Sequence, residues 1–133
     1  MKEKLINLLD NSYSPYSNFR VSCIVIMKDG AEFGGVNVEN ASYGATICAE
    51  RNAIIQAIAH GYSKGDFEKL YVMCDDQDND KTEKGMCCML CRQVIQEFFD
   101  KDKEVISMSL DGNTEKHTVS ELCPYPFDEG DLK

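Results

Sequence analysis

The segment that most limits the fold runs from Phe19 to Met27, with the sequence "FRVSCIVIM". Its odd-numbered positions are apolar, and Ile24 and Ile26 make the opposite side partly apolar as well. Because side chains alternate between the two faces of a strand, this pattern predicts a strand that is buried on much of both faces. A sheet built around such a strand needs other elements to cover both of its sides.

The rest of the chain alternates between helical and strand patterns. The turn signal "KDG" and the segment "AEFGGVNV" predict the returning strand of a hairpin, and "EKLINLLDN" predicts a short helix. Further along, we expect a helix from about Cys48 to His60, a strand from Lys69 to Cys74 and a polar loop from Asp75 to Gly85. The remaining predicted elements are an amphipathic helix with the apolar positions Cys91, Val94, Ile95, Phe98 and Phe99, strands in "EVISMSL" and "EKHTVS", and a helical turn in "ELCPYPFDEG". This order predicts an α/β fold in which helices cover a mixed sheet.

Length and charge limit the possible partners. The 133 residues fit one compact domain, residues 1–133, with a sizeable core. No apolar run approaches the ~20 residues that cross a bilayer, and the N-terminus lacks the hydrophobic stretch of a signal peptide, so a cytoplasmic protein without a membrane partner is expected. The net charge of -9 repels nucleic-acid phosphates, which argues against a polynucleotide partner.

Cysteine spacing indicates a metal site. The chain has seven cysteines, an odd number, and without an export signal they are expected to be thiols or metal ligands, not disulfides. Cys88 and Cys91 are three residues apart at a predicted helix start, so their sulfurs can bind one zinc ion from one face. Cys48, at the start of another helix, is the natural third ligand. Three ligands leave one position of tetrahedral zinc open, as catalytic sites require.

Glu50 follows Cys48 by two residues, within the first turn of the predicted helix. Residues two apart point to different sides of a helix, so Glu50 cannot easily share the metal with Cys48. It can nevertheless reach a water molecule in the open position. Glu50 is therefore the candidate proton shuttle.

Other interpretations of these residues stay open at this level. Cys48 alone could be a small buried apolar residue, and Cys87 could complete a closed, four-thiolate structural site. The carboxylate of Glu50 favours the catalytic interpretation, because a structural site has no use for it. The remaining candidates are expected to be core, surface or inert residues instead of ligands: Cys23, Cys74, Cys123, His60 and His117.

Several motifs together carry a family resemblance. The segments are "PYSNFRV", "GGVNVENASYG", "CAER", the Cys-x-x-Cys-Arg-Gln motif and "ELCPYPF". With them the chain resembles the small homotetrameric cytidine deaminases over nearly its whole length, in the variant of the zinc-deaminase signature where a cysteine, here Cys48, replaces histidine. Two departures are visible: Cys87 replaces the usual proline, and "VSC" stands where Gly-Ala commonly follows the valine. The acidic segment before Cys87 is also longer than usual.

The resemblance implies a three-layer α-β-α cytidine deaminase-like fold with a mixed sheet of about five strands. It further implies one Zn²⁺ per chain, held by Cys48, Cys88 and Cys91. The implied reaction, a step of pyrimidine salvage, is hydrolytic deamination of cytidine and deoxycytidine to uridine and deoxyuridine, with zinc activating water for attack on C4. Glu50 would move a proton to N3 and help ammonia leave.

The resemblance also implies roles in substrate binding. Arg51 would donate to the thiolate sulfurs and offset their charge. The residues expected to contact a nucleoside are Phe19 beside the base, Asn37, Val38 and Glu39 at the ribose, and Ala49 through its backbone. Residues that resemble contacts to a neighbouring subunit's site are Ala41, Tyr43 and Phe127, which together imply a homotetramer with shared active sites.

Three other functions remain to be weighed. A blasticidin-S-type deaminase would share the fold and the zinc motif, but "NVEN" and Phe127 favour a nucleoside site. An RNA or tRNA deaminase would want a basic surface, which this composition lacks. A non-catalytic structural zinc protein would hold metal without deaminating anything.

Overall fold

The computed structural model describes residues 1–79 and 85–133, and its centre is a five-stranded sheet. The strand order is β2-β1-β3-β4-β5, in which β3 and β4 are parallel and the other neighbouring pairs are antiparallel. The strand bounds are β1 Phe19–Met27, β2 Glu32–Val36, β3 Phe67–Asp76, β4 Phe99–Met108 and β5 Thr114–Thr118. The expected mixed sheet of about five strands is confirmed.

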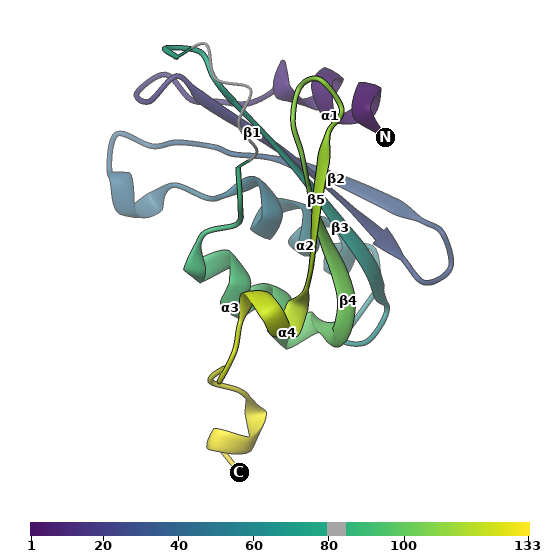
Figure 1. The fold of residues 1–133 in the computed structure, drawn as a ribbon. Helices are drawn as coiled ribbons and strands as arrows, with labels where there is room; N and C mark the ends of the chain where they lie inside the picture. The colour runs from purple at the N-terminus through teal and green to yellow at the C-terminus, as the bar shows by residue number, and fades with distance from the viewer. Residues whose placement is uncertain (80–84) are drawn as a thin grey trace.

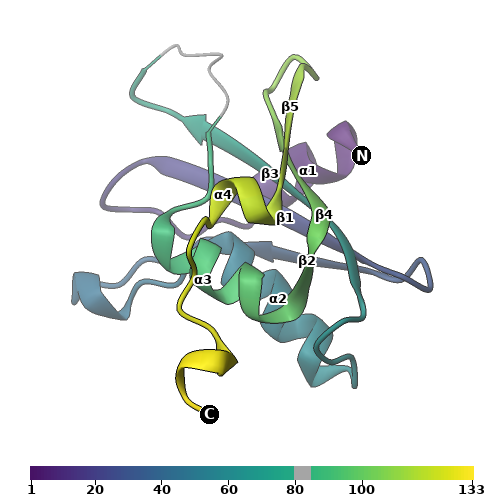
Figure 2. The ribbon, with the colours of Figure 1, turned by 60° about the horizontal axis from the view of Figure 1, so that its bottom comes forward.

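Helices lie on both faces of this sheet, which gives three layers (Figure 1). The first face carries α1 (Lys2–Leu9), and the second carries α2 (Ala49–Ala59), α3 (Met89–Phe98) and the short α4 (Val119–Leu122). Figure 2 turns the second face forward and shows α2 and α3 over the strands. Strand β1 serves both cores, because Cys23 and Val25 join the cluster under α2 while Ile24 joins the cluster under α1. The predicted two-sided burial of this strand is confirmed. Within the described residues, no helix is both long and apolar enough to span a membrane.

Close backbone packing fixes α2 on β2. A Cβ atom at Gly35 would lie 2.5 Å from both the carbonyl oxygen of Ala49 and the amide nitrogen of Ala53, so only glycine allows this approach. The Asn52 side chain adds a hydrogen bond of 2.7 Å from Nδ2 to the carbonyl oxygen of Val36. The first turn of α2 is therefore held directly against the sheet edge, and the residues that flank it have a fixed position.

Strand β3 is longer than the pattern predicts. The expected strand covers 69–74, whereas β3 runs from Phe67 to Asp76, so the predicted polar loop 75–85 begins inside a strand. The extension pairs Arg20 with Asp75 across the strands, at 2.5 Å between Nη2 and Oδ2. The prediction relied on the local apolar pattern, which gives no sign of an ion pair between strands, so it ended the strand too early. Residues 80–84 of the predicted loop lie outside the described residues.

The prediction that Phe99 belongs to the amphipathic helix is wrong. The helix ends at Phe98, and Phe99 has the extended dihedral angles φ -97° and ψ 146° and is the first residue of β4. Its ring packs on Phe67, with 4.8 Å between the ring centroids, and the two residues are register partners. Phe99, the last residue of the predicted helical pattern, thus begins a strand. The next residues of that strand are polar, so the apolar pattern does not reveal where it starts.

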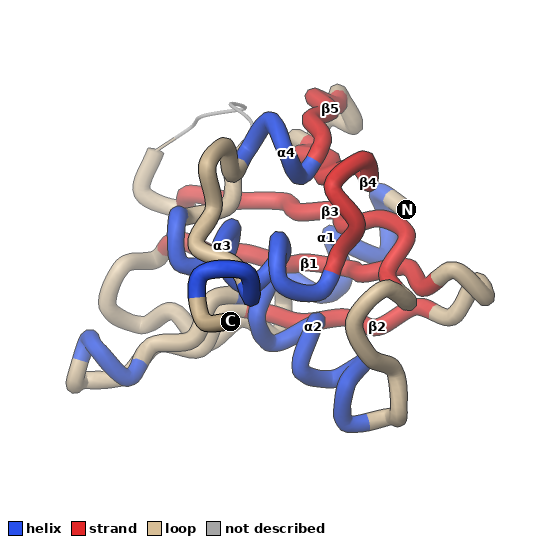
Figure 3. Tube along the Cα trace, turned by 90° about the horizontal axis from the view of Figure 1, so that it is seen from below, coloured by secondary structure: helices blue, strands red, loops and turns tan. Residues whose placement is uncertain are grey.

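The connection between β2 and α2 projects from the body. It contains the short helical turn η1 (Tyr43–Ala45), which stands out at the left of Figure 1 and at the lower left of Figure 3. Two backbone hydrogen bonds of 3.0 Å between Val38 and Ile47 close the base of this loop. The loop therefore begins and ends beside the start of α2.

Candidate metal centre and active site

Two helix starts bring three thiols together. Cys48 and Cys88 are the N-cap residues of α2 and α3, and Cys91 lies in the first turn of α3. Their three sulfur atoms all lie within 4.8 Å of one another, and the sulfurs of Cys48 and Cys88 are 3.8 Å apart. A zinc–sulfur distance of about 2.3 Å gives a tetrahedral edge of about 3.8 Å between two sulfur ligands. The cluster can therefore hold one zinc ion, with both helix N-termini directed at the thiolates.

A guanidinium stands beside this cluster. Arg51 Nη2 donates to Cys48 Sγ at 3.5 Å, whereas the buried Nε of Arg51 has no hydrogen-bond partner among the described residues. A hydrogen bond from Cys91, with smaller contributions from Arg51 and Cys88, outweighs burial and lowers the pKa of Cys48 to about 5. Three thiolates on a divalent ion leave one net negative charge, which this guanidinium can offset.

Glu50 is buried beside the thiols, with 4% of its surface exposed. Burial raises the pKa of Glu50, and the negative charge of Cys48 acts in the same direction. Cys87, next to the ligand pair in sequence, is not part of the sulfur group that could share one ion within the described chain. Burial, with the charge of Glu50, raises the pKa of Cys87 far above its ordinary value. Cys87 is thus a neutral, buried neighbour of the carboxyl.

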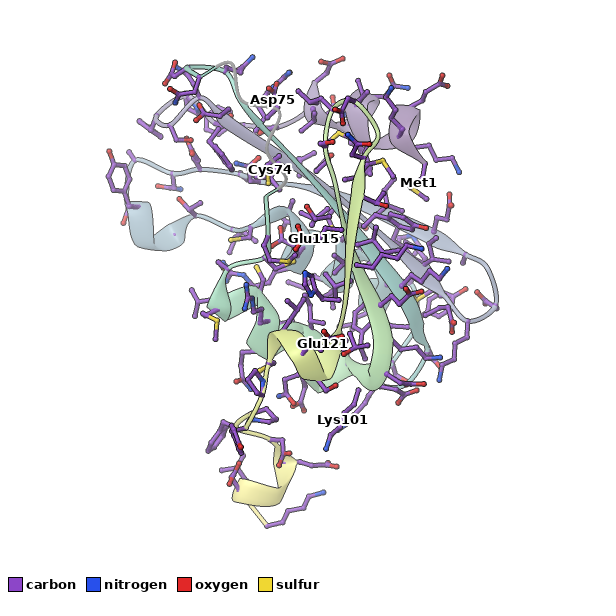
Figure 4. The ribbon with its side chains drawn as sticks, in the orientation of Figure 1. Met1, Cys74, Asp75, Lys101, Glu115 and Glu121 are labelled. Carbon is purple, nitrogen blue, oxygen red and sulfur yellow. The ribbon has the colours of Figure 1, made fainter. Side chains whose placement is uncertain are left out.

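An inner cavity of about 270 Å³ opens onto these groups. It lies beside the carboxyl end of β3, which Figure 4 marks with Cys74 and Asp75. The chain can return over Cys74 only because position 85 is glycine, since a Cβ there would collide with the Cys74 sulfur. The residues that line the inner cavity are Phe19, Val21, Asn37, Thr46, Cys48, Ala49, Glu50, Val72, Cys74, Gly85, Met86 and Cys88.

Sequence reasoning missed part of this lining. Cys74 is expected to be core or inert, yet it faces the cavity, although burial raises the pKa of its thiol to about 12. Register could have found it, because Cys74 is the cross-strand partner of Val21 in β1 and both residues line the cavity. The sequence could not have placed Thr46 and Met86 at the cavity, because both lie outside helices and strands and so have no register partner.

A second hollow, the outer recess, adjoins the inner cavity. It has a volume of about 350 Å³ and is lined by Tyr16, Ser17, Glu39, Tyr43 and Thr46. Thr46 lines both hollows, so they meet at this residue. The inner cavity contains the thiols of Cys48 and Cys88, and the outer recess contains the carboxylate of Glu39.

Asn37 and Glu39 lie just beyond the end of β2, where they are held separately. Asn37 Oδ1 accepts from Val21 N at 2.9 Å and from Ser12 Oγ at 2.5 Å, while Nδ2 donates to the Phe19 carbonyl oxygen at 2.8 Å. Glu39 Oε1 accepts from the backbone amides of Tyr16 at 3.0 Å and Ser17 at 3.2 Å. Asn37 lines the inner cavity and Glu39 lines the outer recess.

Of the other predicted substrate residues, Ala49 lies in the inner cavity and the rest lie farther out. Val38 is 43% exposed and lines neither hollow, whereas Ala49 is buried and lines the inner cavity. Ala41 is exposed, and Tyr43 is 75% exposed at the outer recess. Phe127 is 58% exposed in the tail that leads away from the body in Figure 1. A single chain therefore does not bring Phe127 into the site.

A thiol cluster with a buried carboxyl beside it, under two helix starts on a mixed sheet, defines a zinc-dependent hydrolase centre. The family model of the cytidine and deoxycytidylate deaminase zinc-binding region matches residues 1–109. The chain therefore belongs to the cytidine and deoxycytidylate deaminase family. The three-thiol cluster, with its tetrahedral sulfur spacing, fits the zinc that this region binds.

Individual relatives agree with this assignment. A cytidine deaminase of Halalkalibacterium halodurans is 37% identical over 131 residues, which cover 98% of this chain and 93% of the relative. A probable cytidine deaminase of Dictyostelium discoideum is 40% identical over 134 residues, covering 98% of this chain and 86% of the relative. The crystal structure of cytidine deaminase from Burkholderia pseudomallei matches with a TM-score of 0.86 at 35% identity, over 94% of each chain.

Proposed function

We propose that the chain catalyses the zinc-dependent hydrolytic deamination of cytidine and deoxycytidine to uridine, deoxyuridine and ammonia. The observation that carries the proposal is the buried Glu50 at a cavity whose wall contains the thiols of Cys48 and Cys88. The family, and relatives that are themselves named cytidine deaminases, support the same reaction. Pyrimidine salvage is the metabolic role that this chemistry serves.

Glu50 acts as the proton carrier in this proposal. Bound zinc supplies the Lewis acidity that makes water a nucleophile near neutral pH. Glu50 accepts a proton from the attacking water and delivers it to N3 of the pyrimidine as C4 becomes tetrahedral. Glu50 then takes the proton of the new C4 hydroxyl and passes it to the amino group, so that the C4=O bond forms as the C4–N bond breaks and ammonia leaves. Burial suits this role, because it raises the pKa of Glu50 above its ordinary value and so makes the carboxylate a better proton acceptor.

The two hollows fit the two parts of a nucleoside. Phe19, Ala49 and Glu50 border the inner cavity, where the base would lie. Asn37 Nδ2 has a second hydrogen after donating to Phe19, and it can donate to a sugar hydroxyl. Glu39 in the outer recess can accept from one. Glu39 and the net charge of -9 oppose a 5′-phosphate, so free nucleosides are the preferred substrates.

The assembly is proposed to be a homotetramer of single-domain, cytoplasmic chains with active sites shared between subunits. Tyr43 and Phe127 are large and exposed in the single chain, at a projecting loop and a projecting tail. Large apolar groups on such segments fit contact with a neighbouring copy. Ala41 belongs to the same loop, where it would approach a neighbour's sugar.

A side-by-side deamination assay tests the proposal. Cytosine, cytidine, deoxycytidine, dCMP, a short C-containing oligonucleotide and blasticidin S are each incubated with zinc-loaded protein, and ultraviolet absorbance follows their conversion. The two nucleosides are expected to react fastest, with cytosine poor because the polar groups of the outer recess would lose their partners. Faster conversion of blasticidin S, dCMP or the oligonucleotide would overturn the substrate assignment. A zinc-bound protein that deaminates none of them would be a structural zinc protein.

A further inference from the structure

Ser17 connects the two hollows through a single hydroxyl group. Its Oγ donates to Glu39 Oε2, while the same Oγ accepts from the backbone amide of Phe19 at 3.0 Å. The backbone amide of Ser17 also donates to Glu39 Oε1, at 3.2 Å. Ser17 therefore holds both oxygens of the Glu39 carboxylate and ties them to the first residue of β1, which borders the inner cavity.

The loop around Ser17 is itself anchored on both sides. Tyr13 and the 37–39 segment exchange two backbone hydrogen bonds, Tyr13 N to Asn37 O at 3.0 Å and Glu39 N to Tyr13 O at 2.8 Å. Asn18, next to Ser17, has φ 54° in the left-handed region, and its carbonyl oxygen accepts from Gln77 N at 3.0 Å. The backbone of the loop that carries Ser17 is thus held by the 37–39 segment on one side and by Gln77 on the other.

The acceptor capacity of Glu39 leaves room for one more partner. An ionised carboxylate offers about four acceptor positions. Three are taken by the amides of Tyr16 and Ser17 and by the Ser17 hydroxyl. Partial burial opposes ionisation, but the hydrogen bonds from Ser17 and from the two amides outweigh it, so the pKa of Glu39 lies below its ordinary value. No cation is paired with Glu39 among the described residues, so its free position suits a neutral hydroxyl donor.

We propose that Ser17 is a positioning residue for substrate recognition: it orients Glu39 so that one carboxylate oxygen accepts from a sugar hydroxyl, and it fixes the spacing between the sugar-binding recess and the base-binding cavity. This inference rests on the proposed nucleoside deaminase function. Ser17 acts through Glu39 and takes no part in proton transfer. Removing its hydroxyl should therefore weaken binding of substrates that carry the sugar hydroxyls and leave the chemistry at Glu50 intact.

Steady-state kinetics of the zinc-loaded Ser17→Ala variant test this role. With cytidine we expect kcat/KM to fall about tenfold, mainly through KM, as for loss of a hydrogen bond to a charged group. With 2′,3′-dideoxycytidine, which has neither hydroxyl, the variant and the wild type should have the same kcat/KM. In a Glu39→Gln background, Ser17→Ala should add no further loss on cytidine. Ser17→Thr, which keeps the hydroxyl, should restore most of the cytidine activity.

Ser63→Ala is the matched control, because Ser63 Oγ also contacts a carboxylate, Asp66 Oδ2 at 3.4 Å, in a turn outside both hollows. It should leave both substrates unaffected. Equal losses on cytidine and dideoxycytidine, additive losses with Glu39→Gln, or failure of Ser17→Ala to fold would overturn the positioning role. The wild-type rate on cytidine separates the two claims: an inactive wild type refutes the deaminase function, whereas an active wild type with one of those results refutes the role of Ser17 alone.

Discussion

The two faces of the sheet are built in different ways. On the first face, α1 packs through leucine side chains, and the core there consists of Leu5, Leu9, Ile24, Met73 and Met108. On the second face, α2 touches β2 with its own backbone at Gly35. The second face also carries the buried Glu50 and the sulfur cluster.

The two kinds of packing respond differently to substitution. Side-chain packing, as under α1, can adjust to a change in volume, because side chains can change rotamer. Backbone packing, as under α2, cannot adjust without moving a whole helix and the groups at its end. The structure therefore predicts that substitutions that displace the α2 backbone affect metal binding, proton transfer and substrate position together, whereas comparable changes under α1 have only a small effect on stability.

The largest effect is expected for the metal ligands. Cys88→Ala should lose zinc and activity together, because two thiols rarely hold zinc at a site that needs three protein ligands. Cys87→Ala, the neighbouring control, should keep one zinc per chain, since Cys87 is not in the sulfur cluster. Metal content by atomic spectroscopy distinguishes the two variants. Equal zinc loss in both would exclude the three-ligand site.

A large loss of rate without loss of metal is expected for Glu50→Gln. The amide cannot carry the proton, so kcat should fall by at least ~10²–10⁴-fold. Zinc content and cytidine binding should stay close to those of the wild type, because Glu50 is not in the sulfur cluster. Rapid-mixing kinetics with parallel metal analysis provides the measurement. Turnover near the wild-type rate would remove Glu50 from the mechanism.

Two adjacent glycines test the contrast between the faces directly. Gly35→Ala places a methyl group against the α2 backbone, and we expect the free energy of unfolding to fall by ~1–3 kcal/mol or more. Gly34→Ala meets only the Leu8 side chain, whose Cδ1 would be 2.9 Å away and can rotate, so the cost should be smaller. Urea denaturation of both variants measures the difference. If the Gly34 variant is as unstable as the Gly35 variant, the contrast between the faces is wrong.

The smallest effect is expected at the C-terminal tail. Gln93 and Gln96 of α3 hold the carbonyl oxygen of Phe127 at 2.7 and 3.0 Å, which leaves the ring exposed. If this ring stacks on a base in a neighbour's site, Phe127→Ala should lower kcat/KM by up to about tenfold, as expected for one aromatic contact. Light scattering should find the active wild-type protein as a tetramer. A fully active monomer would contradict the shared site.

The sequence predicts the elements whose apolar pattern is continuous. The bounds of β1 agree with the prediction, and α2 lies within the expected helix, with Cys48 as its N-cap. The polar ends of β3 and β4 were not predictable from the local apolar pattern, because their residues form ion pairs with distant parts of the chain. Asp75 of β3 pairs with Arg20 of β1, and Asp100 of β4 pairs with Lys28 in the turn after β1.

In the candidate site, too, features with a local sequence pattern could be predicted and features that depend on long-range contacts could not. The thiols of Cys48, Cys88 and Cys91 could be brought together from helix starts and spacing, because the ligand chemistry of zinc requires a third group. The hydrogen bonds from Ser12 to Asn37 and from Ser17 to Glu39 could not be predicted, because they depend on how the 10–18 loop folds back on those two residues. Serine in a loop carries no local signal of a distant partner.

The most direct test of the central claim is a zinc titration of metal-free protein, followed by cytidine conversion. Chelator-treated protein should be inactive, and activity should rise linearly with added zinc to a plateau at one ion per chain. The product should be uridine with one ammonia for each cytidine consumed. Activity without metal, a plateau at a different stoichiometry, or a fully zinc-loaded protein that leaves cytidine unchanged would contradict a three-thiolate zinc deaminase.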